Sequence, residues 1–367
     1  MPEAINAHRL HALFKQMVDL YTPSGKEEQL TQFLEEYLAG TNLKVERQPV
    51  DETRANLLIS AEGSRCEHLF LGHIDTVPAY DIEQFEFSER EGICSGLGTA
   101  DMKGGCAAMI EAFQTAAEQN ALGSSAVLAL VVGEEETGDG TRALLETHTF
   151  RSAIVAEPTN LEPCIEHYGY VELIVRAFGY RRHAAMSNRD TNAIHALLRF
   201  LIRLEDTVER DEPETVLNIR DLHSAESGFA VPDRCAVRVD LHITPEIKAG
   251  AYADGLKQFV NTCLSESKAS RYEVEFPTLA DGYRLEPDNE LVVKLKGIYE
   301  ELSIDWSPAA FKSHSDANML RDAGCSPIIL GPGQLAKAHT LDESVAFNQV
   351  EAAVAVYVKL LAALQTN

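Results

Sequence analysis

The stretch LFLGHIDTVP, residues 69–78, is an apolar run that ends in a histidine and an aspartate two residues apart. Its apolar part predicts a short strand at residues 68–72, and similar runs recur at residues 57–60, 126–132 and 153–156. Helical patterns separate these runs, at residues 102–119 and 141–145. Strands that alternate with helices predict an α/β fold, with parallel strands in a sheet that helices cover on both faces.

The pattern changes from about Gly169. Alternating runs at residues 171–177, 236–243 and 272–276 flank helical stretches near 192–208 and 246–267, which predicts a smaller α+β unit. After Tyr283 the first pattern resumes, with a helix at 289–302, a strand at 327–330 and a final helix at 348–364. We therefore expect an inserted domain at residues 169–285, and a larger domain made of residues 1–168 and 286–367.

Two helices are expected near the N-terminus. Residues 1–20 mix polar and apolar side chains, which favours an amphipathic helix over the uninterrupted apolar core of a signal peptide. Ser24 and Glu27 have the spacing of a capping box, and apolar residues then repeat at helical spacing until Gly40.

Composition narrows the classes of partner. The chain has 57 acidic and 32 basic residues and a formal net charge of −25, which opposes binding to nucleic acid and to anionic membranes. The longest apolar run, residues 126–132, is far shorter than the roughly 20 residues of a membrane-spanning helix. The seven cysteines are scattered without a C-x-x-C pair, so we expect free thiols and a cytoplasmic location.

Candidate metal-binding side chains follow the ends of the apolar strands, where parallel α/β sheets place their active sites. They are His73, Glu134, Glu135, Glu157 and His339, with Asp101 in the glycine-rich loop 96–101. A lone histidine is more often a hydrogen-bonded core residue, and a lone Glu-Glu pair is usually a solvated surface. Together, two imidazoles and several carboxylates suit zinc, cobalt or manganese. Asp75 lies two residues after His73, on the same side of an extended segment, and is expected to accept the second imidazole N–H.

These motifs resemble the co-catalytic dizinc amidohydrolases and peptidases of the M20 type, among them acetylornithine deacetylase, succinyl-diaminopimelate desuccinylase, aminoacylase and glutamate carboxypeptidase. The resemblance covers nearly the whole chain. It is carried by LGHIDTVP at 71–78, the segment 96–105 with DMKGG at 101–105, GEEE at 133–136, AEPT at 156–159 and AHTLDE at 338–343. It implies a three-layer, zinc-exopeptidase-like catalytic domain with a mixed, mostly parallel sheet, and an inserted lid and dimerisation domain.

The resemblance also implies the roles of the site residues. Asp101 bridges two metal ions, His73 and Glu157 complete the first site, and Glu135 and His339 complete the second. Zn²⁺ is the first choice of metal, with Co²⁺ or Mn²⁺ as alternatives. A water shared by the two ions is the nucleophile, and Glu134 is the general base. A cis peptide is expected between Asp101 and Met102.

Three consecutive glutamates leave the register of this motif open. The base and ligand can be Glu134 and Glu135, or Glu135 and Glu136. We prefer the first pair, because it lies directly at the strand end and leaves Gly140 six residues after the base, as is usual in the family. Glu136 is then a surface or neighbouring residue.

His183 matches the lid histidine that in this family reaches across a dimer interface to stabilise the oxyanion of the tetrahedral intermediate. This interpretation requires a homodimer formed through the lid. The alternative is an ordinary surface histidine, because the small-residue motif that follows usually begins with serine and here begins with Ala184.

Two positions depart from the family pattern. Phe229 stands where the lid usually has asparagine, and His242 where it usually has arginine, and both usual residues help to hold the substrate. His242, Arg181, Arg182 and Arg220 are therefore our candidate substrate-binding residues. His314, in the segment 312–318 at the substrate-loop position, is expected to be structural.

The resemblance favours deacylation of a small N-acylated amino acid. Glu157 within AEPT is closer to the deacetylase and desuccinylase branch, which implies a role in amino-acid biosynthesis, and the acidic chain suggests an acylated diamino acid such as acetylornithine. The first alternative is a metal-dependent dipeptidase or carboxypeptidase, and the second is a non-catalytic metal-binding homologue. Nucleotide binding is disfavoured, because Asp101 stands where the third glycine of a dinucleotide fingerprint would lie.

Overall fold

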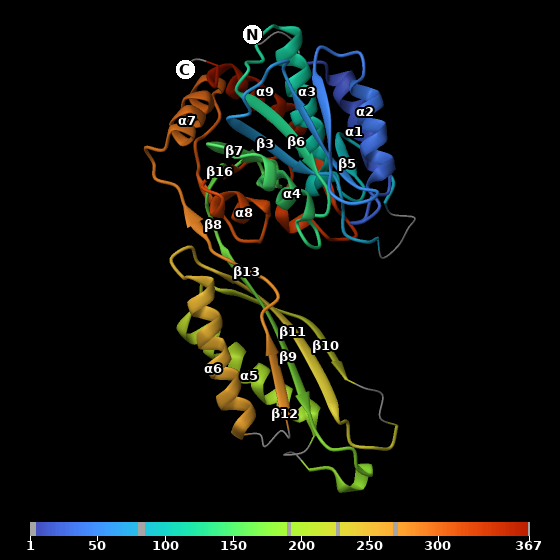
Figure 1. Ribbon diagram of the computed structural model, residues 1–367, viewed down its shortest axis with the longest axis vertical. Coiled ribbons are helices and arrows are strands. Elements are labelled where there is room, and N and C mark those ends of the chain that lie inside the picture. The colour runs from blue at the N-terminus through green and yellow to red at the C-terminus, as the bar shows by residue number, and fades with distance from the viewer. Residues whose placement is uncertain (1–4, 80–84, 189–191, 225–227, 267–270, 366–367) are drawn as a thin grey trace. The chain divides into compact units, whose positions relative to one another are not determined.

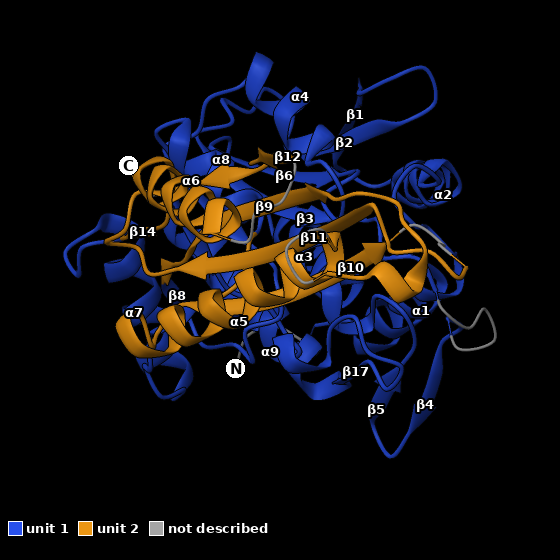
Figure 2. Ribbon diagram, turned by 90° about the horizontal axis from the view of Figure 1, so that it is seen from below, with its two compact units in different colours: residues 1–165, 285–311, 315–367 blue, residues 166–284, 312–314 orange. Residues whose placement is uncertain are grey.

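The computed structural model describes residues 5–79, 85–188, 192–224, 228–266 and 271–365. The chain forms two compact units (Figure 2). Unit 1 comprises Met1–Ile165, Leu285–Phe311 and Ser315–Asn367, and unit 2 comprises Glu166–Arg284 and Lys312–His314. The sequence predicted the borders between the two domains at 168/169 and 285/286, and the corresponding unit borders in the structure are 165/166 and 284/285.

Unit 1 is built on a mixed sheet, whose strands β3, β6, β7, β16 and β8 are labelled in Figure 1. The strand order is β1 (Lys44–Pro49), β2 (Ala55–Ser60), β6 (Ala126–Val131), β3 (His68–His73), β7 (Ser152–Val155), β16 (Ser326–Ile329) and β8 (Cys164–His167), with β15 (Ala309–Phe311) also paired to β8. The four central strands β6, β3, β7 and β16 are parallel, and the pairs on either side of them are antiparallel. Their carboxyl ends therefore meet at one edge of the sheet.

Helices cover both faces of this sheet, because β2, β3, β6 and β7 are buried at every position. One group comprises α1 (Ala7–Asp19), α2 (Glu28–Leu38), α3 (Gly104–Glu118), α7 (Glu290–Leu302) and α9 (Phe347–Ala363), and the other α4 (Asp139–Thr147) and α8 (Asp316–Asp322). Phe70 of β3 contacts Phe113 of α3 and Tyr357 of α9 edge to face, which ties the first group to the sheet centre.

A small antiparallel sheet of β4 (Ser88–Arg90), β5 (Ile93–Ser95) and β17 (Ser344–Ala346) completes unit 1. Its central strand β5 runs into the turn η2 (Thr99–Lys103), and β17 follows the short helix η4 (Leu335–Lys337). This sheet therefore brings the segment before Asp101 next to the segment after His339.

The capping box predicted at Ser24 is wrong, although the helix is present. Helix α2 begins at Glu28, with Glu27 as its N-cap and no side-chain cap. The Ser24 hydroxyl instead donates to Oδ2 of Asp75, at 2.6 Å, because the carboxylate is the stronger acceptor. Glu27 is fully buried, with Oε1 3.7 Å from the guanidinium of Arg54.

Unit 2 is an antiparallel sheet with two helices on one face. The strand order is β10 (Val216–Ser224), β11 (Arg234–Ile243), β9 (Gly169–Phe178) and β12 (Arg271–Glu275), with β13 (Leu279–Ala280) also paired to β9, and β14 (Tyr283–Arg284) pairs with the end of β8. Alternate residues of β9 and β11 pack against α5 (Ala193–Asp211) and α6 (Ala249–Glu266). The remaining positions carry Tyr170, Glu172, Asp240 and His242 on the opposite face.

Two further observations concern the cysteines and the length of the apolar helices. All seven cysteines are free thiols. No helix in the described part of the chain is long and apolar enough to cross a membrane.

Candidate metal centre

The candidate ligands meet at the carboxyl edge of the parallel strands of unit 1. His73 is the last residue of β3, Glu134 and Glu135 follow β6, and Glu157 follows β7. Asp101 lies in η2 and His339 in the loop between η4 and β17. The parallel register of β3, β6 and β7 thus aligns side chains that are far apart in the sequence.

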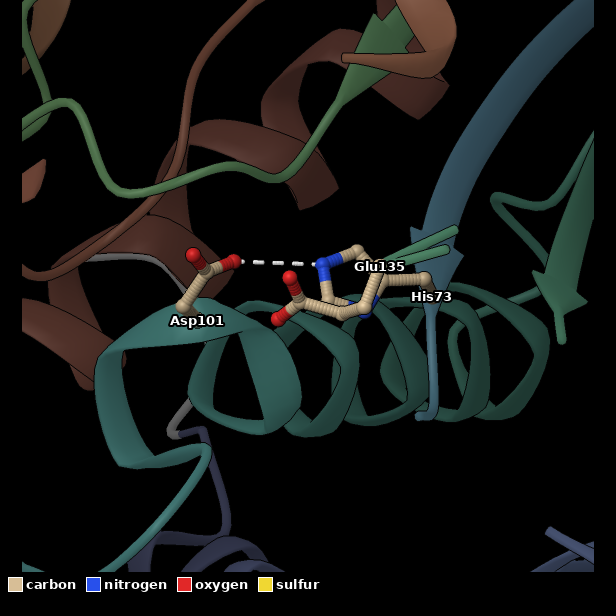
Figure 3. A group of neighbouring side chains, drawn as sticks. All are labelled: His73, Asp101 and Glu135. Atoms are coloured by element: carbon tan, nitrogen blue, oxygen red, sulfur yellow. Dashed lines mark hydrogen bonds and ion pairs between the residues drawn. The ribbon is translucent and has the colours of Figure 1, made fainter. Parts of the chain in front are cut away.

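Asp101 lies between the two histidines. Its Oδ1 is 3.1 Å from Nε2 of His73, and its Oδ2 is 3.3 Å from Nε2 of His339. Glu157 approaches His73, with Oε1 3.8 Å from Nε2, and Glu135 approaches His339, with Oε1 at 3.0 Å from Nε2. Figure 3 shows His73, Asp101 and Glu135 turned toward one another. Each oxygen of Asp101 therefore faces a different imidazole, and each imidazole has one further carboxylate.

Two groups of ligand atoms lie close enough together to hold a cation. The atoms of His73, Asp101 and Glu135 lie within 4.8 Å of one another, and so do those of His73, Glu134 and Glu157. Imidazole nitrogens and carboxylate oxygens are the donors that zinc, cobalt and manganese accept in proteins. The donor set therefore fits divalent metal ions.

The electrostatics of the cluster lead to the same conclusion. Burial raises the pKa of the Glu134 and Glu157 carboxyls well above their usual range, and nearby carboxylates add to both shifts. Burial alone would lower the pKa of His73, but the hydrogen bond to Asp101 and the charge of Glu157 raise it well above its usual value. The cluster holds more buried carboxylates than imidazoles, and bound dications would compensate this excess of negative charge.

The second imidazole N–H of His73 was expected to donate to the Asp75 carboxylate, but its partner is a backbone carbonyl. Nδ1 of His73 hydrogen-bonds to the backbone carbonyl of Asp75 at 3.1 Å, and the nearest carboxylate oxygen of Asp75 is 3.6 Å away. The carboxylate instead accepts the backbone N–H groups of Glu134, at 3.2 Å, and Glu135, at 3.1 Å. It turns toward these donors because both N–H groups come from the turn after β6, next to β3. Asp75 thereby holds the backbone of both glutamates.

Glu343 holds the loop of Asp101 in a similar way. Its buried carboxylate accepts the backbone N–H groups of Gly98, Ala100 and Asp101 at 2.9–3.0 Å. The peptide bond between Asp101 and Met102 is cis, as the resemblance implied. Glu343 belongs to the AHTLDE motif, but the motif alone does not indicate its function, since its partners lie more than 240 residues away.

The three consecutive glutamates differ in exposure and in their backbone contacts. Glu136 is exposed, whereas Glu134 and Glu135 are only partly accessible and their N–H groups are bound by Asp75. Gly140 lies so close to the backbone of Val132 that a Cβ atom there would be 2.5 Å from the carbonyl oxygen. This contact explains why a glycine stands at this distance from the strand end.

His183 lies in unit 2, on an exposed turn. It precedes the turn η3 (Ala184–Met186), and its Nδ1 accepts the backbone N–H of Ala185 at 3.2 Å. The backbone of Arg182–Ala184 pairs with Phe229–Val231, and the Phe229 side chain is 91% exposed. Arg182 stacks over the ring of Tyr180, and Arg181 is exposed on the same segment.

The other two candidates of unit 2 lie inside contact networks. Arg220 forms a 2.5 Å ion pair with Glu172, and its Nη1 is 3.5 Å from Asp240. The ring of His242 lies 5.3 Å from that of Tyr170, which is also 5.0 Å from the ring of His314. Arg220 is therefore paired with two carboxylates of unit 2, and His314 is half-buried.

The model of Peptidase family M20/M25/M40 matches residues 69–363. An acetylornithine deacetylase of Salmonella arizonae is 29% identical, over 83% of this chain and 82% of that protein.

Solved structures share the fold. A tripeptidase of Staphylococcus aureus superposes with a TM-score of 0.83 at 21% identity, covering 99% of this chain and 100% of that one. A Bacillus subtilis protein described as a dinuclear metal-binding peptidase of the M20 family superposes with a TM-score of 0.73 at 12% identity, covering 98% of each chain. The family match spans most of the chain and all the candidate ligands, and so the protein belongs to peptidase family M20/M25/M40 and is a metal-dependent enzyme that hydrolyses amide bonds.

Proposed function

We propose that the protein uses two divalent metal ions to remove the acyl group from a small N-acylated amino acid. The observation that carries the proposal is the position of Asp101, whose two carboxylate oxygens face His73 on one side and His339 on the other. Zinc is our first choice of metal, and cobalt or manganese are alternatives. The Bacillus subtilis relative described as dinuclear supports the number of ions.

In this proposal Asp101 bridges the ions, His73 and Glu157 bind the first, and Glu135 and His339 bind the second. When bound, such ions polarise the scissile carbonyl and lower the pKa of water. Every ligand belongs to unit 1, so the rigid central strands set the spacing of the donors.

Glu134 is proposed as the general base. Its carboxylate lies within 4.8 Å of the ligand atoms of His73 and Glu157, and its backbone N–H is held by Asp75. From that position it takes the proton of the attacking water and delivers it to the departing amine. Glu136 is exposed on the same turn and has no such position.

His183 is proposed to stabilise the oxyanion from a partner subunit. Because Nδ1 accepts the N–H of Ala185, the neutral ring carries its proton on Nε2, which remains a donor. Tyr180, Met186 and Phe229 are large exposed apolar side chains on the same two segments, which supports a contact surface here. His183→Gln should lower kcat without loss of metal, and sedimentation should show a dimer; a monomer at assay concentrations would contradict this role.

The relatives support the substrate class. The Salmonella arizonae relative is an acetylornithine deacetylase, and Glu157 within AEPT favours the same branch. Nα-Acetylornithine is therefore one substrate to test. Among the candidate substrate-binding residues, Arg181, Arg182 and His242 remain proposals, and the ion pairs of Arg220 make it the weakest. A di- or tripeptidase activity is the second candidate, favoured by the tripeptidase fold match.

The proposal is tested by amine release from N-acetyl and N-succinyl amino acids and from dipeptides, with metal-stripped protein before and after addition of Zn²⁺ or Co²⁺. We expect metal-dependent release from the acyl amino acids. Release from dipeptides alone would move the protein to the peptidases. Metal binding without any release would favour a non-catalytic homologue.

We also propose a cytoplasmic location. The seven free thiols support it, since a reducing compartment keeps cysteines unpaired. Non-reducing mass spectrometry of protein purified from its own cells should find no disulfide.

A further inference from the structure

A cavity of about 440 Å³ opens beside the metal centre, within unit 1. His339 lines this cavity and also faces Asp101 and Glu135 in the metal centre. The apolar side chains that line it are Val77, Pro78, Ala79, Phe85, Phe87, Leu97 and Leu341. The volume is within the roughly 300–1,000 Å³ of small-molecule sites and exceeds what an acetyl group would fill.

Three wall segments are direct continuations of ligand segments. Val77 follows the strand end that carries His73, and Leu97 precedes Asp101 on the glycine-rich loop. Leu341 lies two residues after His339. A substrate whose carbonyl is polarised at the ion that His339 would hold therefore has one substituent beside this cavity.

Hydrogen bonds hold the walls in place. The N–H of Leu97 donates to the carbonyl of Phe85 at 3.3 Å, and the N–H of Ala79 to the hydroxyl of Tyr21 at 3.0 Å. The N–H of Phe87 donates to Asp19 at 2.9 Å, which anchors this wall to the end of α1. The cavity is thus formed before any substrate binds, so little binding energy is spent on ordering it.

The charges of the lining disfavour an anionic occupant. None of the described residues that line the cavity is lysine or arginine, and its two carboxylates are those of Glu343 and of the exposed Glu86. The carboxylate of Glu343 is buried and saturated by three backbone N–H donors, so it is not offered to a ligand cation either. Apolar walls with few free charges select a ligand by shape and apolar area.

We infer that this cavity, the Leu97–Leu341 cavity, binds an apolar substituent of the substrate, larger than acetyl, next to the scissile amide. The inference rests on the proposed function and gives it a specificity: apolar N-acyl amino acids are preferred over acetylated cationic ones. The apolar group is either a medium-length acyl chain or an apolar amino-acid side chain, and the two are separated by the test.

The test measures binding first, so that it does not depend on turnover. Metal-loaded Glu134→Gln protein is titrated with N-acetyl-, N-butanoyl-, N-hexanoyl- and N-octanoylglycine, and separately with the N-acetyl derivatives of glycine, leucine, phenylalanine and ornithine. We expect affinity to rise about threefold to fourfold per methylene in one series until the cavity is full. The series that rises identifies the substituent. Equal affinity throughout both series would overturn the inference.

Two variants test whether the rise in affinity comes from this cavity. Ser88 is exposed on β4 and lines the cavity, so Ser88→Trp should cut the ratio of octanoyl to acetyl affinity, or phenylalanine to glycine affinity, by at least about tenfold. Arg90→Trp, on the same strand but outside the lining, is the matched control and should keep the ratio. An unchanged ratio in Ser88→Trp would place the apolar site elsewhere and overturn the inference.

Wild-type hydrolysis of the same compounds separates the two proposals. Graded binding without hydrolysis of any acyl amino acid would contradict the proposed function and leave the apolar site standing. Hydrolysis at the same rate whatever the apolar substituent, together with equal affinities, would support the proposed function and overturn the apolar site.

Discussion

At the scale of single residues, the candidate metal centre depends on two carboxylates, Asp75 and Glu343, that are not among the proposed metal ligands. Asp75 accepts the N–H groups of Glu134 and Glu135 together with the Ser24 hydroxyl, so one buried anion fixes the proposed base and a proposed ligand. Glu343 fixes the loop of Asp101 by the same means. Outer groups of this kind set the geometry that the reacting groups need.

Asp75→Asn tests this positioning role. The amide replaces one acceptor oxygen by a donor that faces N–H groups, so the turn of Glu134 and Glu135 should shift. We expect kcat to fall about 10- to 100-fold with a weaker effect on KM, and metal affinity to fall at the same time. Steady-state kinetics and metal titration check both. Ser24→Ala removes only the third donor and should have a much smaller effect; equal losses in the two variants would contradict the account.

At the scale of elements, the prediction from sequence succeeded where a strand is buried on both faces. The apolar runs at 68–72 and 126–132 became β3 and β6, because continuous burial leaves a continuous apolar pattern. Strands β1 and β10 were missed, since both are largely exposed and have no apolar run. The mixed α/β fold and the family resemblance are confirmed.

The details of the site were harder to predict than its residue types. Which donor meets the Asp75 carboxylate depends on how the turn after β6 packs against β3, and the spacing of residues does not contain that information. The contact of Glu343 with Asp101 depends on β17 pairing with β5, across most of the chain. The metal-ligand and base assignments remain predictions that the geometry makes testable.

A histidine cluster at the end of the unit 2 sheet predicts a pH dependence of stability. Burial lowers the pKa of His314 to about 4 and that of His167 to about 3, and it also lowers the pKa of His242. In the unfolded chain a histidine binds its proton near pH 6.5. Because the unfolded state takes up protons first, stability should fall as pH drops from 6.5 to 4, by roughly 3 kcal/mol for His314.

His314→Gln removes this titration and should flatten the pH dependence of the free energy of unfolding over that window. Urea denaturation at several pH values measures the slope. His223→Gln is the matched control, since His223 is exposed on β10 of the same unit. Parallel slopes for wild type and His314→Gln would show that His314 is not held neutral by the fold.

At the scale of the whole molecule, a chain with a net charge of −25 concentrates buried carboxylates at one edge of one sheet. Repulsion among them is a cost to folding that bound cations would remove. Removal of metal with a chelator should therefore lower the melting temperature. At a free metal concentration of a hundred times Kd, each ion stabilises by about 2.7 kcal/mol, which corresponds to several degrees.

Calorimetry of the chain with and without chelator checks this prediction. Asp101→Ala should remove the dependence, since it deletes the proposed bridging ligand. An unchanged melting temperature in the wild-type chain after complete metal removal would mean that the cluster is stable without cations.

The central claim, that a two-metal centre hydrolyses the amide with Glu134 as base, is tested most directly by Glu134→Gln, with metal content and kcat measured on the same sample. We predict two ions per chain, as in the wild type, and a loss in kcat of about 10² to 10⁴. The matched control Glu136→Gln should keep wild-type kcat, and Asp101→Ala should lose metal as well as activity. Near-normal turnover by Glu134→Gln with its metal in place would contradict the account.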